Sequence, residues 1–204
     1  MVTYSRKVVA NESFWTWANL VTLLRTLVCL IIFSIAATTH NENANYLGLG
    51  VYLILDNLDG YLARALNQET LLGAQFDILS DRILTTFFYF NFLEQYNELA
   101  LAVVLFLVQF MVLDHLLSNQ FLRWPIISPN YFYEVDRVIW ALNWSAPGKM
   151  SNTGLFTMLI LLTRSTWVVF PVLLSLIGIK VYSLIRLYQI PGPPQVGSLY
   201  KPGN

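Results

Sequence analysis

Charged side chains, cysteines and histidines are all scarce in this chain of 204 residues. Charged residues make up 12% of the sequence and their formal net charge is zero, so bulk electrostatics favours no nucleic acid or other polyanionic partner. The single cysteine, Cys29, has no second cysteine for an internal disulfide, and we interpret it as a small residue in an apolar helix. His40 and His115 stand alone, so the sequence contains no Cys/His pattern for a metal site.

Apolar side chains, by contrast, are abundant. Hydrophobic residues account for 56% of the chain and aromatic residues for 15%, and the mean hydropathy is +0.54. This composition is typical of an integral membrane protein. Residues 1–13 are polar and no small-residue cleavage site follows a short apolar core, so we expect no cleavable signal peptide.

The apolar residues are grouped into runs that polar or proline-containing segments separate. These runs predict an all-α integral membrane protein with six transmembrane helices, at residues 20–37, 46–64, 71–93, 99–122, 151–162 and 166–188. Trp15 and Trp17 predict a short N-terminal interfacial segment, with a disordered tail as the alternative. We therefore divide the chain into a cytoplasmic or interfacial segment at 1–18, a six-helix domain at 19–190 and a flexible tail at 191–204.

Four aspartates lie at helical spacing between two of these apolar runs. Asp56 and Asp59 are three residues apart, and Asp77 and Asp81 are four apart, so each pair shares one face of a helix. The short turn at 67–70 predicts an antiparallel helix pair, which places one aspartate pair opposite the other. Four unpaired carboxylates cannot sit together in a low-dielectric setting, and Mg²⁺, Mn²⁺ or Ca²⁺ would neutralise them.

The alternative interpretation of these aspartates is that they are helix caps and solvated loop charges. That interpretation suits a single aspartate near a helix end. It does not explain the set, because these four residues are among only twelve acidic residues in the chain and share helical spacing. An ionisable residue inside an apolar membrane segment is a candidate functional residue.

The segment of residues 56–81 resembles, without a gap, the signature of the CDP-alcohol phosphotransferases, D-x₂-D-G-x₂-A-R-x₈-G-x₃-D-x₃-D. The matching residues are Asp56, Asp59, Gly60, Ala63, Arg64, Gly73, Asp77 and Asp81. The resemblance implies that a phosphatidyl group is transferred from CDP-diacylglycerol to the hydroxyl of a small polar acceptor, with release of CMP. It also implies Mg²⁺ or Mn²⁺ as the cofactor, with two ions bound, membrane lipid as a partner, and a homodimer.

The same resemblance assigns roles to the motif residues. Asp56, Asp59, Asp77 and Asp81 would be metal ligands, and Asp81 would also be the catalytic base that takes the proton of the acceptor hydroxyl. Five residues are assigned to the CDP-linked lipid, two of them from a segment at 19–25 that resembles the start of the family's first transmembrane helix. They are Asn19, Thr22, Gly60, Arg64 and Gly73.

Two stretches resemble different members of this family and leave the acceptor open. The ALNQ turn at 65–68 and the D-x-L-x-D-R ending at 77–82 resemble phosphatidylinositol synthases. The stretch APGKMSNT at 146–153 resembles phosphatidylglycerophosphate synthases, although its lysine could also simply anchor a helix end at the interface. We favour a polyol such as inositol and keep glycerol 3-phosphate as the alternative. The basic candidates for acceptor binding are Arg82, Arg123, Arg137, Lys149 and Arg186.

The distribution of basic residues predicts the orientation in the membrane. With the N-terminus inside, most basic residues fall on or near the cytoplasmic side: Arg6, Lys7, Arg64, Arg82, Arg123, Arg137, Lys149, Arg186 and Lys201. Arg164 falls outside, where the loops carry Glu42, Glu94 and Glu98. The predicted site therefore faces the cytoplasm at the membrane surface, and a lipid could enter it sideways between helices.

Two other classes of protein also place carboxylates within a membrane. An ion transporter would explain buried aspartates but not the glycines and Arg64 of the motif, and the chain contains no inverted repeat. An aspartate-rich membrane prenyltransferase generally has two separate Asp-rich loops and more helices than this chain supplies.

The sequence leaves two interpretations of Asp114 and His115 open. These residues either face the polar cavity or mark the point where their helix emerges toward water.

Overall fold

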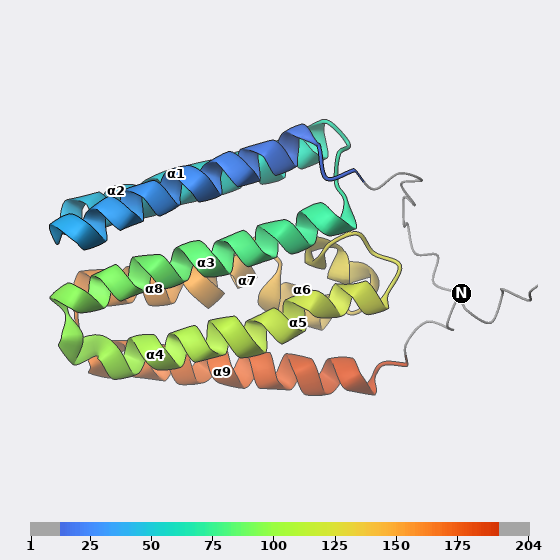
Figure 1. The fold of residues 1–204 in the computed structure, drawn as a ribbon. Helices are drawn as coiled ribbons and strands as arrows, with labels where there is room; N and C mark the ends of the chain where they lie inside the picture. The colour runs from blue at the N-terminus through green and yellow to red at the C-terminus, as the bar shows by residue number, and fades with distance from the viewer. Residues whose placement is uncertain (1–12, 192–204) are drawn as a thin grey trace, which may run out of the picture.

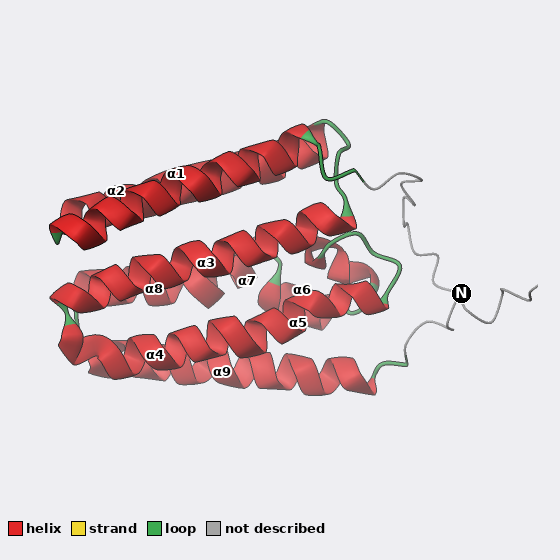
Figure 2. Ribbon diagram, in the orientation of Figure 1, coloured by secondary structure: helices red, strands yellow, loops and turns green. Residues whose placement is uncertain are grey.

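The computed structural model describes residues 13–191, and within that range its regular structure is helical, without a β-strand (Figures 1 and 2). The prediction of an all-α fold is confirmed for this part of the chain. The predictions for residues 1–12, which include Arg6 and Lys7, lie outside the described residues. The same holds for residues 192–204 of the predicted tail at 191–204, which include Lys201.

Long helices alternate with short connections along the chain. The elements are α1 (Trp17–Thr39), α2 (Glu42–Ala65), α3 (Leu71–Gln95), η1 (Asn97–Leu99), α4 (Ala100–Val108), η2 (Gln109–Asp114), α5 (His115–Asn119), η3 (Gln120–Arg123), η4 (Pro129–Glu134), α6 (Arg137–Asn143), α7 (Ala146–Lys149), η5 (Met150–Gly154), α8 (Leu155–Thr163) and α9 (Thr166–Gln189). The six predicted segments correspond to α1, α2, α3, the stretch from α4 to η3, α8 and α9.

Three helical stretches in the described part of the chain are long and apolar enough to cross a membrane. They are Trp17–Thr39, Asn97–Arg123 and Thr166–Gln189. The helices α2 and α3 are of similar length, but they carry the charged side chains of the motif. Six membrane spans therefore stay a prediction, whereas three apolar helices of spanning length are found.

Polar side chains fix the starts of the three N-terminal helices. Thr16, Asn41 and Thr70 each accept a hydrogen bond from the backbone N–H three residues further on, as N-cap residues do. The connections between these helices are short, and His40 and Asn67 turn the chain in the left-handed conformation, with φ values of 52° and 53°. Successive helices are therefore antiparallel (Figure 1).

The helix α3 lies between the motif helix α2 and the rest of the bundle. In Figure 1, α1 and α2 form the upper edge, α3 follows below them, and α4, α5 and α9 form the lower edge. The contacts agree with this view, because α1 packs on α2 and α3 while α9 packs on α4, η2, α6 and α8.

Two hydrophobic clusters hold α3 in place, one toward each end. The larger contains Phe88 of α3 together with Phe106 of α4 and Phe156 of α8, whose rings stack with centroids 4.2 Å apart. The smaller contains Ile78 of α3 together with Phe132 and other residues of the later segments. Close packing of these side chains holds α3 against its neighbours through van der Waals contacts. The clusters thus fix the helix that carries the second half of the motif.

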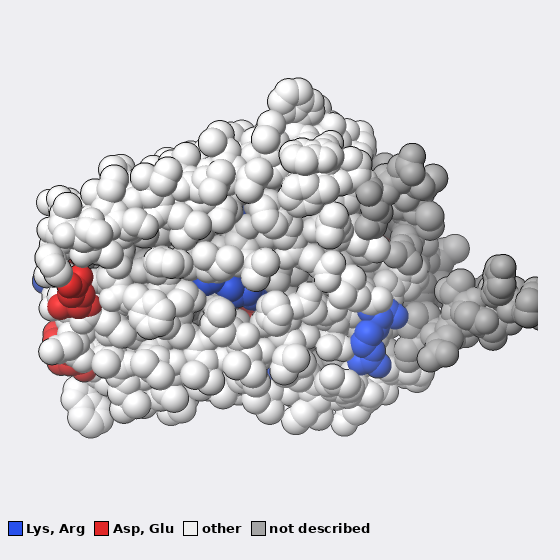
Figure 3. Space-filling view, viewed as in Figure 1, with Lys and Arg blue, Asp and Glu red and all other residues white. Residues whose placement is uncertain are grey.

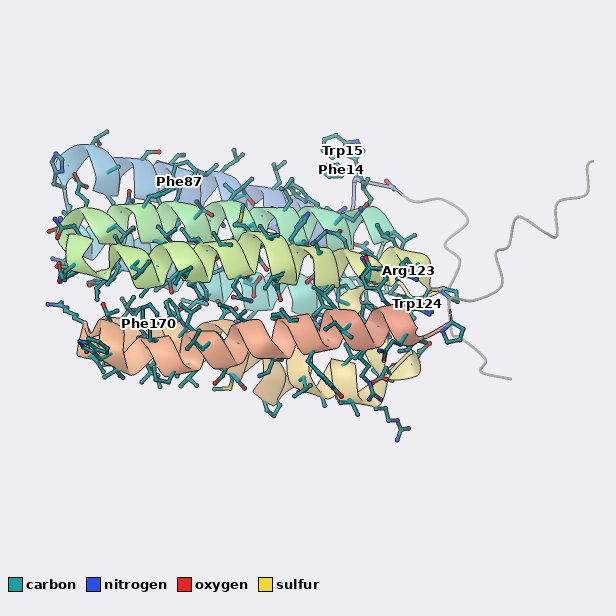
Figure 4. The ribbon with its side chains drawn as sticks, turned by 90° about the horizontal axis from the view of Figure 1, so that it is seen from below. Phe14, Trp15, Phe87, Arg123, Trp124 and Phe170 are labelled. Atoms are coloured by element: carbon teal, nitrogen blue, oxygen red, sulfur yellow. The ribbon has the colours of Figure 1, made fainter. Side chains whose placement is uncertain are left out.

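The outer faces of the long helices are apolar. Leu24 and Ile31 of α1, Leu101 of α4 and Leu174 of α9 are all exposed. Figure 3 shows a face that is nearly free of charge between its two ends, apart from a narrow central gap. A continuous apolar surface of this kind suits contact with lipid. Trp15, which projects from one end of the bundle in Figure 4, is 79% exposed, a position that suits an interfacial anchor.

Candidate active site

The four aspartates of the motif come together where α2 and α3 face each other. Asp56 and Asp59 lie in the second half of α2, whereas Asp77 and Asp81 lie in the first half of α3. One carboxylate oxygen each from Asp56, Asp59 and Asp77 lies within 4.8 Å of the other two. Asp81 is outside this group of three, although it lines the same cavity. The short turn between the helices thus places residues up to 25 positions apart around one site.

Arg25 of α1 lies between the two aspartate pairs. Its Nη1 is bonded to Asp56 and lies 3.4 Å from Oδ2 of Asp59. Its Nη2 lies 2.9 Å from Oδ1 of Asp77 and 3.2 Å from Oδ1 of Asp81. The Arg25 side chain is 0% exposed. We did not predict this arrangement, although a lone arginine within an apolar run is a signal that could have led to it.

The carboxylates border a cavity of about 680 Å³. Beside the aspartates, its wall includes the apolar side chains of Leu49 and Leu53 of α2 and of Met158 and Leu161 of α8. The cavity therefore offers both charged and hydrocarbon surface within one space. This combination is suited to an amphipathic ligand.

Asn19, Thr22 and Gly73 lie where α1 contacts the two motif helices. The hydroxyl of Thr22 lies 2.8 Å from Oδ2 of Asp59 and so orients this carboxylate. A Cβ atom at position 73 would lie 2.5 Å from Oδ1 of Asn19 and 2.8 Å from Oγ1 of Thr70. Gly73 therefore leaves room for the side-chain ends of Asn19 and Thr70 where α1 approaches α3, and this packing reason was not predicted from the sequence.

Gly60 and Arg64 lie on the cavity wall one turn apart on α2. A Cβ atom at position 60 would lie 3.5 Å from a guanidinium nitrogen of Arg64, which is an ordinary contact. Gly60 thus leaves space in the cavity and does not relieve a backbone clash. Arg64 places a cation at the wall, where it can meet an anionic ligand.

Comparison with known proteins gives the same family as the aspartate motif. The family model for CDP-alcohol phosphatidyltransferase matches residues 15–182. This chain belongs to that family. A Candida albicans protein described as CDP-diacylglycerol--inositol 3-phosphatidyltransferase is 34% identical over 84 residues. The aligned part is 41% of this chain and spans about a third (36%) of that relative, and no solved structure matches.

The donor atoms of this phosphatidyltransferase-family site fit a divalent cation. Carboxylate oxygens are the protein ligands that Mg²⁺ and Mn²⁺ prefer, and those of Asp56, Asp59 and Asp77 are close enough to contact one ion. The side chains of Asp56 and Asp77 are 35% and 44% exposed, so an ion can reach them from the cavity. When ionised, the four aspartates outnumber the single positive charge of Arg25, which further favours a bound cation.

The structure separates the five basic residues that were predicted to bind the acceptor. Arg82 and Lys149 line the cavity, whereas Arg123, Arg137 and Arg186 do not. The five side chains are therefore not brought into one pocket. The sequence could not separate them, because all five are basic and the local pattern does not show which of them face the cavity.

Two of the basic residues away from the cavity have other contacts. The guanidinium of Arg123 lies 5.0 Å from the ring centroid of Trp124 and 5.2 Å from that of Tyr188. These are cation–π contacts at the end of the bundle, where Figure 4 shows Arg123 beside Trp124. Nε of Arg186 donates a hydrogen bond of 2.8 Å to Asp136, which caps α6. Both side chains tie the later helices together.

Asp114 lines the cavity and is held by two buried cations. Its Oδ2 lies 2.6 Å from Nη2 of Arg82, and its Oδ1 lies 2.6 Å from Nζ of Lys180. Lys180 also donates a hydrogen bond of 2.8 Å to Oδ1 of Asn143. Of the two alternatives for Asp114, the structure supports the cavity, which His115 does not line. Lys180 was missed in the sequence, although it is a single lysine within an apolar helix.

Two π-helical segments border the cavity. They are η2 and η5, and they present Asp114 and Asn152 to the enclosed space. A π-helical turn is wider than an α-helical one and is found frequently at functional sites. The local widening changes the direction of the side chains, which periodicity in the sequence does not reveal.

Hydrogen bonds from η4 and from the start of α1 hold the turn between α2 and α3 in place. Tyr131 of η4 donates a hydrogen bond of 2.6 Å to Oε2 of Glu69, and the backbone N–H of Trp17 donates one of 2.9 Å to Oε1 of Gln68. Burial, followed by the hydrogen bond to Glu69, raises the pKa of Tyr131 above its ordinary value. The phenol therefore stays protonated, and remains a donor, at neutral pH.

Proposed function

We propose that this protein transfers the phosphatidyl group of CDP-diacylglycerol to a hydroxyl of inositol and releases CMP. The observation that carries the proposal is the four-aspartate cluster beside a cavity with both polar and apolar walls. Membership of the CDP-alcohol phosphatidyltransferase family supports the reaction class. The description of the Candida albicans relative supports inositol as the acceptor.

The donor would bind with its diphosphate near the aspartates and Arg64. Its acyl chains would follow the apolar wall that Leu49 and Leu53 form with α8. Because the acyl chains leave one apolar environment, the bilayer, for another, this wall contributes packing contacts to binding and no large hydrophobic transfer free energy. Gly60 leaves room on the wall between the two ends of the donor.

The reaction breaks the phosphorus–oxygen bond to CMP and forms one to the acceptor oxygen. Asp56, Asp59 and Asp77 would hold divalent cations, which neutralise the diphosphate and stabilise the leaving CMP when bound. Asp81 would take the proton of the acceptor hydroxyl as the new bond forms. Its side chain is 24% exposed and lines the cavity, so a hydroxyl can approach it.

The cavity wall next to Asp81 suits an uncharged polyol. Arg82 is already paired with Asp114, and Ser118 and Asn152 add uncharged polar groups to the wall. Such groups can donate to and accept from several hydroxyls. Glycerol 3-phosphate is the second candidate, because Lys149 also lines the cavity and could bind its phosphate.

We also propose six membrane spans, a site on the cytoplasmic face and a homodimer. The three apolar helices of spanning length and the apolar exterior support a membrane protein. The distribution of basic residues along the sequence supports the orientation. The dimer rests on the family resemblance.

The decisive experiment uses the full chain purified in detergent with CDP-diacylglycerol, Mg²⁺ or Mn²⁺ and one acceptor at a time. The acceptors are inositol, inositol phosphate, glycerol 3-phosphate and serine. We expect CMP release and a lipid product with inositol, loss of activity in chelator, and recovery when the cation is restored. Product with glycerol 3-phosphate alone would move the assignment to the second candidate. Ion flux in liposomes without any CMP release would support a transporter and overturn the proposal.

A further inference from the structure

We propose that Arg25 is a positioning residue that sets the spacing of the four metal-binding aspartates from the side opposite the cavity. The inference rests on the proposed function, because it takes the aspartates as metal ligands. It concerns a residue of α1, outside the signature that α2 and α3 carry. Arg25 itself would touch neither substrate.

The two amino groups of the Arg25 guanidinium serve the two aspartate pairs separately. Nη1 contacts the pair on α2, and Nη2 contacts the pair on α3. A guanidinium is planar and rigid, so the distance between its two amino groups is fixed. One side chain from a third helix therefore sets the separation of carboxylates that two other helices supply.

Arg25 approaches the carboxylates from the closed side of the site. It is 0% exposed and is not among the residues that line the cavity, whereas the aspartates line it. In Asp56, Asp77 and Asp81, the atom nearest to Arg25 is Oδ1. At Asp59 the atom near Arg25 is Oδ2. Arg25 thus approaches each carboxylate through one oxygen and leaves the other for a second ligand. The guanidinium and a metal ion can therefore hold the same carboxylate at once.

The charge of Arg25 also matters for the site without metal. Four ionised carboxylates repel one another in a low-dielectric setting, and a guanidinium, which stays protonated in proteins, offsets one of their charges. The loaded site would contain the four ionised aspartates, Arg25, Arg64, two divalent cations and a doubly charged diphosphate. The formal charges of these groups add up to zero. Without Arg25 the same set would be left with one uncompensated negative charge.

The test measures thermal unfolding of the full chain in detergent, first in chelator and then with increasing Mn²⁺. We expect Arg25→Gln to lower the midpoint in chelator and to show a larger metal-induced rise than the wild type. The rise is larger because cations then relieve a repulsion that Arg25 otherwise offsets. Arg25→Lys keeps the charge but loses the planar fork, so its metal-induced rise should lie between the two.

Arg186→Gln is the control, since Arg186 is also an arginine paired with a carboxylate in this bundle. Its partner Asp136 is not one of the four aspartates, and neither residue lines the cavity. Arg186→Gln should lower the midpoint in chelator but leave the metal-induced rise equal to that of the wild type. An equal change in that rise for both arginine variants would show a general loss of stability and overturn the inference.

A double variant keeps the test decisive where Arg25→Gln alone folds poorly. Adding Asp77→Asn removes one of the mutually repelling charges. In chelator, the double variant should therefore unfold at a higher temperature than Arg25→Gln. Where Arg25→Gln yields no folded protein, the double variant should yield some. A double variant that is no better than Arg25→Gln would contradict the coupling.

The result also separates this inference from the proposed function. A wild type that shows neither a metal-induced rise nor CMP release would overturn the proposed function. A wild type that shows both, with a metal-induced rise unaltered in Arg25→Gln and Arg25→Lys, would overturn only the role of Arg25.

Discussion

Lys180 of α9 and Asp114 of η2 form an ion pair of 2.6 Å inside the helical bundle, where Lys180 is 1% exposed. Asp114 also binds Arg82 of α3, one residue after Asp81. The last helix is thereby connected, through one carboxylate, to the helix that carries half of the aspartate cluster. The carboxylate of Asp114 thus links α9, η2 and α3 within the bundle.

We expect Lys180→Met to destabilise the protein by about 1–3 kcal/mol, because the variant removes one of the two buried cations that satisfy Asp114. Methionine fills a similar volume, so the loss reports the ion pair more than a cavity. Thermal unfolding in detergent measures the effect. The double variant with Asp114→Asn should recover part of the loss, and strictly additive losses would argue against a direct interaction.

We expect Asp81→Asn to reduce turnover by at least about 10²-fold, because an amide cannot take the proton of the acceptor hydroxyl. Binding of CDP-diacylglycerol should remain measurable, since the other three aspartates and Arg64 are kept. The control is Asp136→Asn, at a helix cap away from the cavity, where asparagine also caps well. Normal turnover in Asp81→Asn would remove this residue from the mechanism.

We expect Gly73→Ala to destabilise the protein by about 1–3 kcal/mol, because the added methyl would lie 2.5 Å from Oδ1 of Asn19. The matched substitution is Gly178→Ala in α9, where no atom lies within 4 Å of the added Cβ. That change should be neutral or stabilise the helix by about 0.5–1 kcal/mol. Unfolding midpoints in detergent compare the two, and equal effects would show that the contact of α1 with α3 is not tight.

We expect Lys149→Gln to raise the KM for the acceptor, and to raise it more for glycerol 3-phosphate than for inositol, because only the former carries a phosphate. Arg123→Gln is the control, since Arg123 lies over aromatic rings and does not line the cavity. Its acceptor KM should stay at the wild-type value. Steady-state kinetics at saturating CDP-diacylglycerol measures both. If only Arg123→Gln raised the acceptor KM, the result would indicate that the acceptor binds at the end of the bundle and not beside Lys149.

Local patterns in the sequence predicted the helices and the candidate site because helical periodicity is a short-range property. The spacing of Asp56, Asp59, Asp77 and Asp81 was sufficient to place the pairs on two helix faces, and the short turn between them predicted that the faces would meet. The same motif indicated the family that comparison with known proteins confirms.

Contacts between distant helices could not be read from periodicity. Arg25 is separated from Asp56 by 31 residues and from Asp81 by 56, and nothing in the local pattern gives the rotation of α1 that directs the guanidinium toward both. The two π-helical turns are equally hidden, because they shift side-chain direction without a change in composition.

The sequence by itself determined that the chain is helical and apolar, and which acidic residues share a helix face, since these follow from residue type and spacing. Only the tertiary structure decided that the Arg25 guanidinium contacts all four aspartates, and which basic residues line the cavity. The physical reason is that a buried charge is stabilised by partners within a few ångströms in space, and those partners come from helices far apart in the chain.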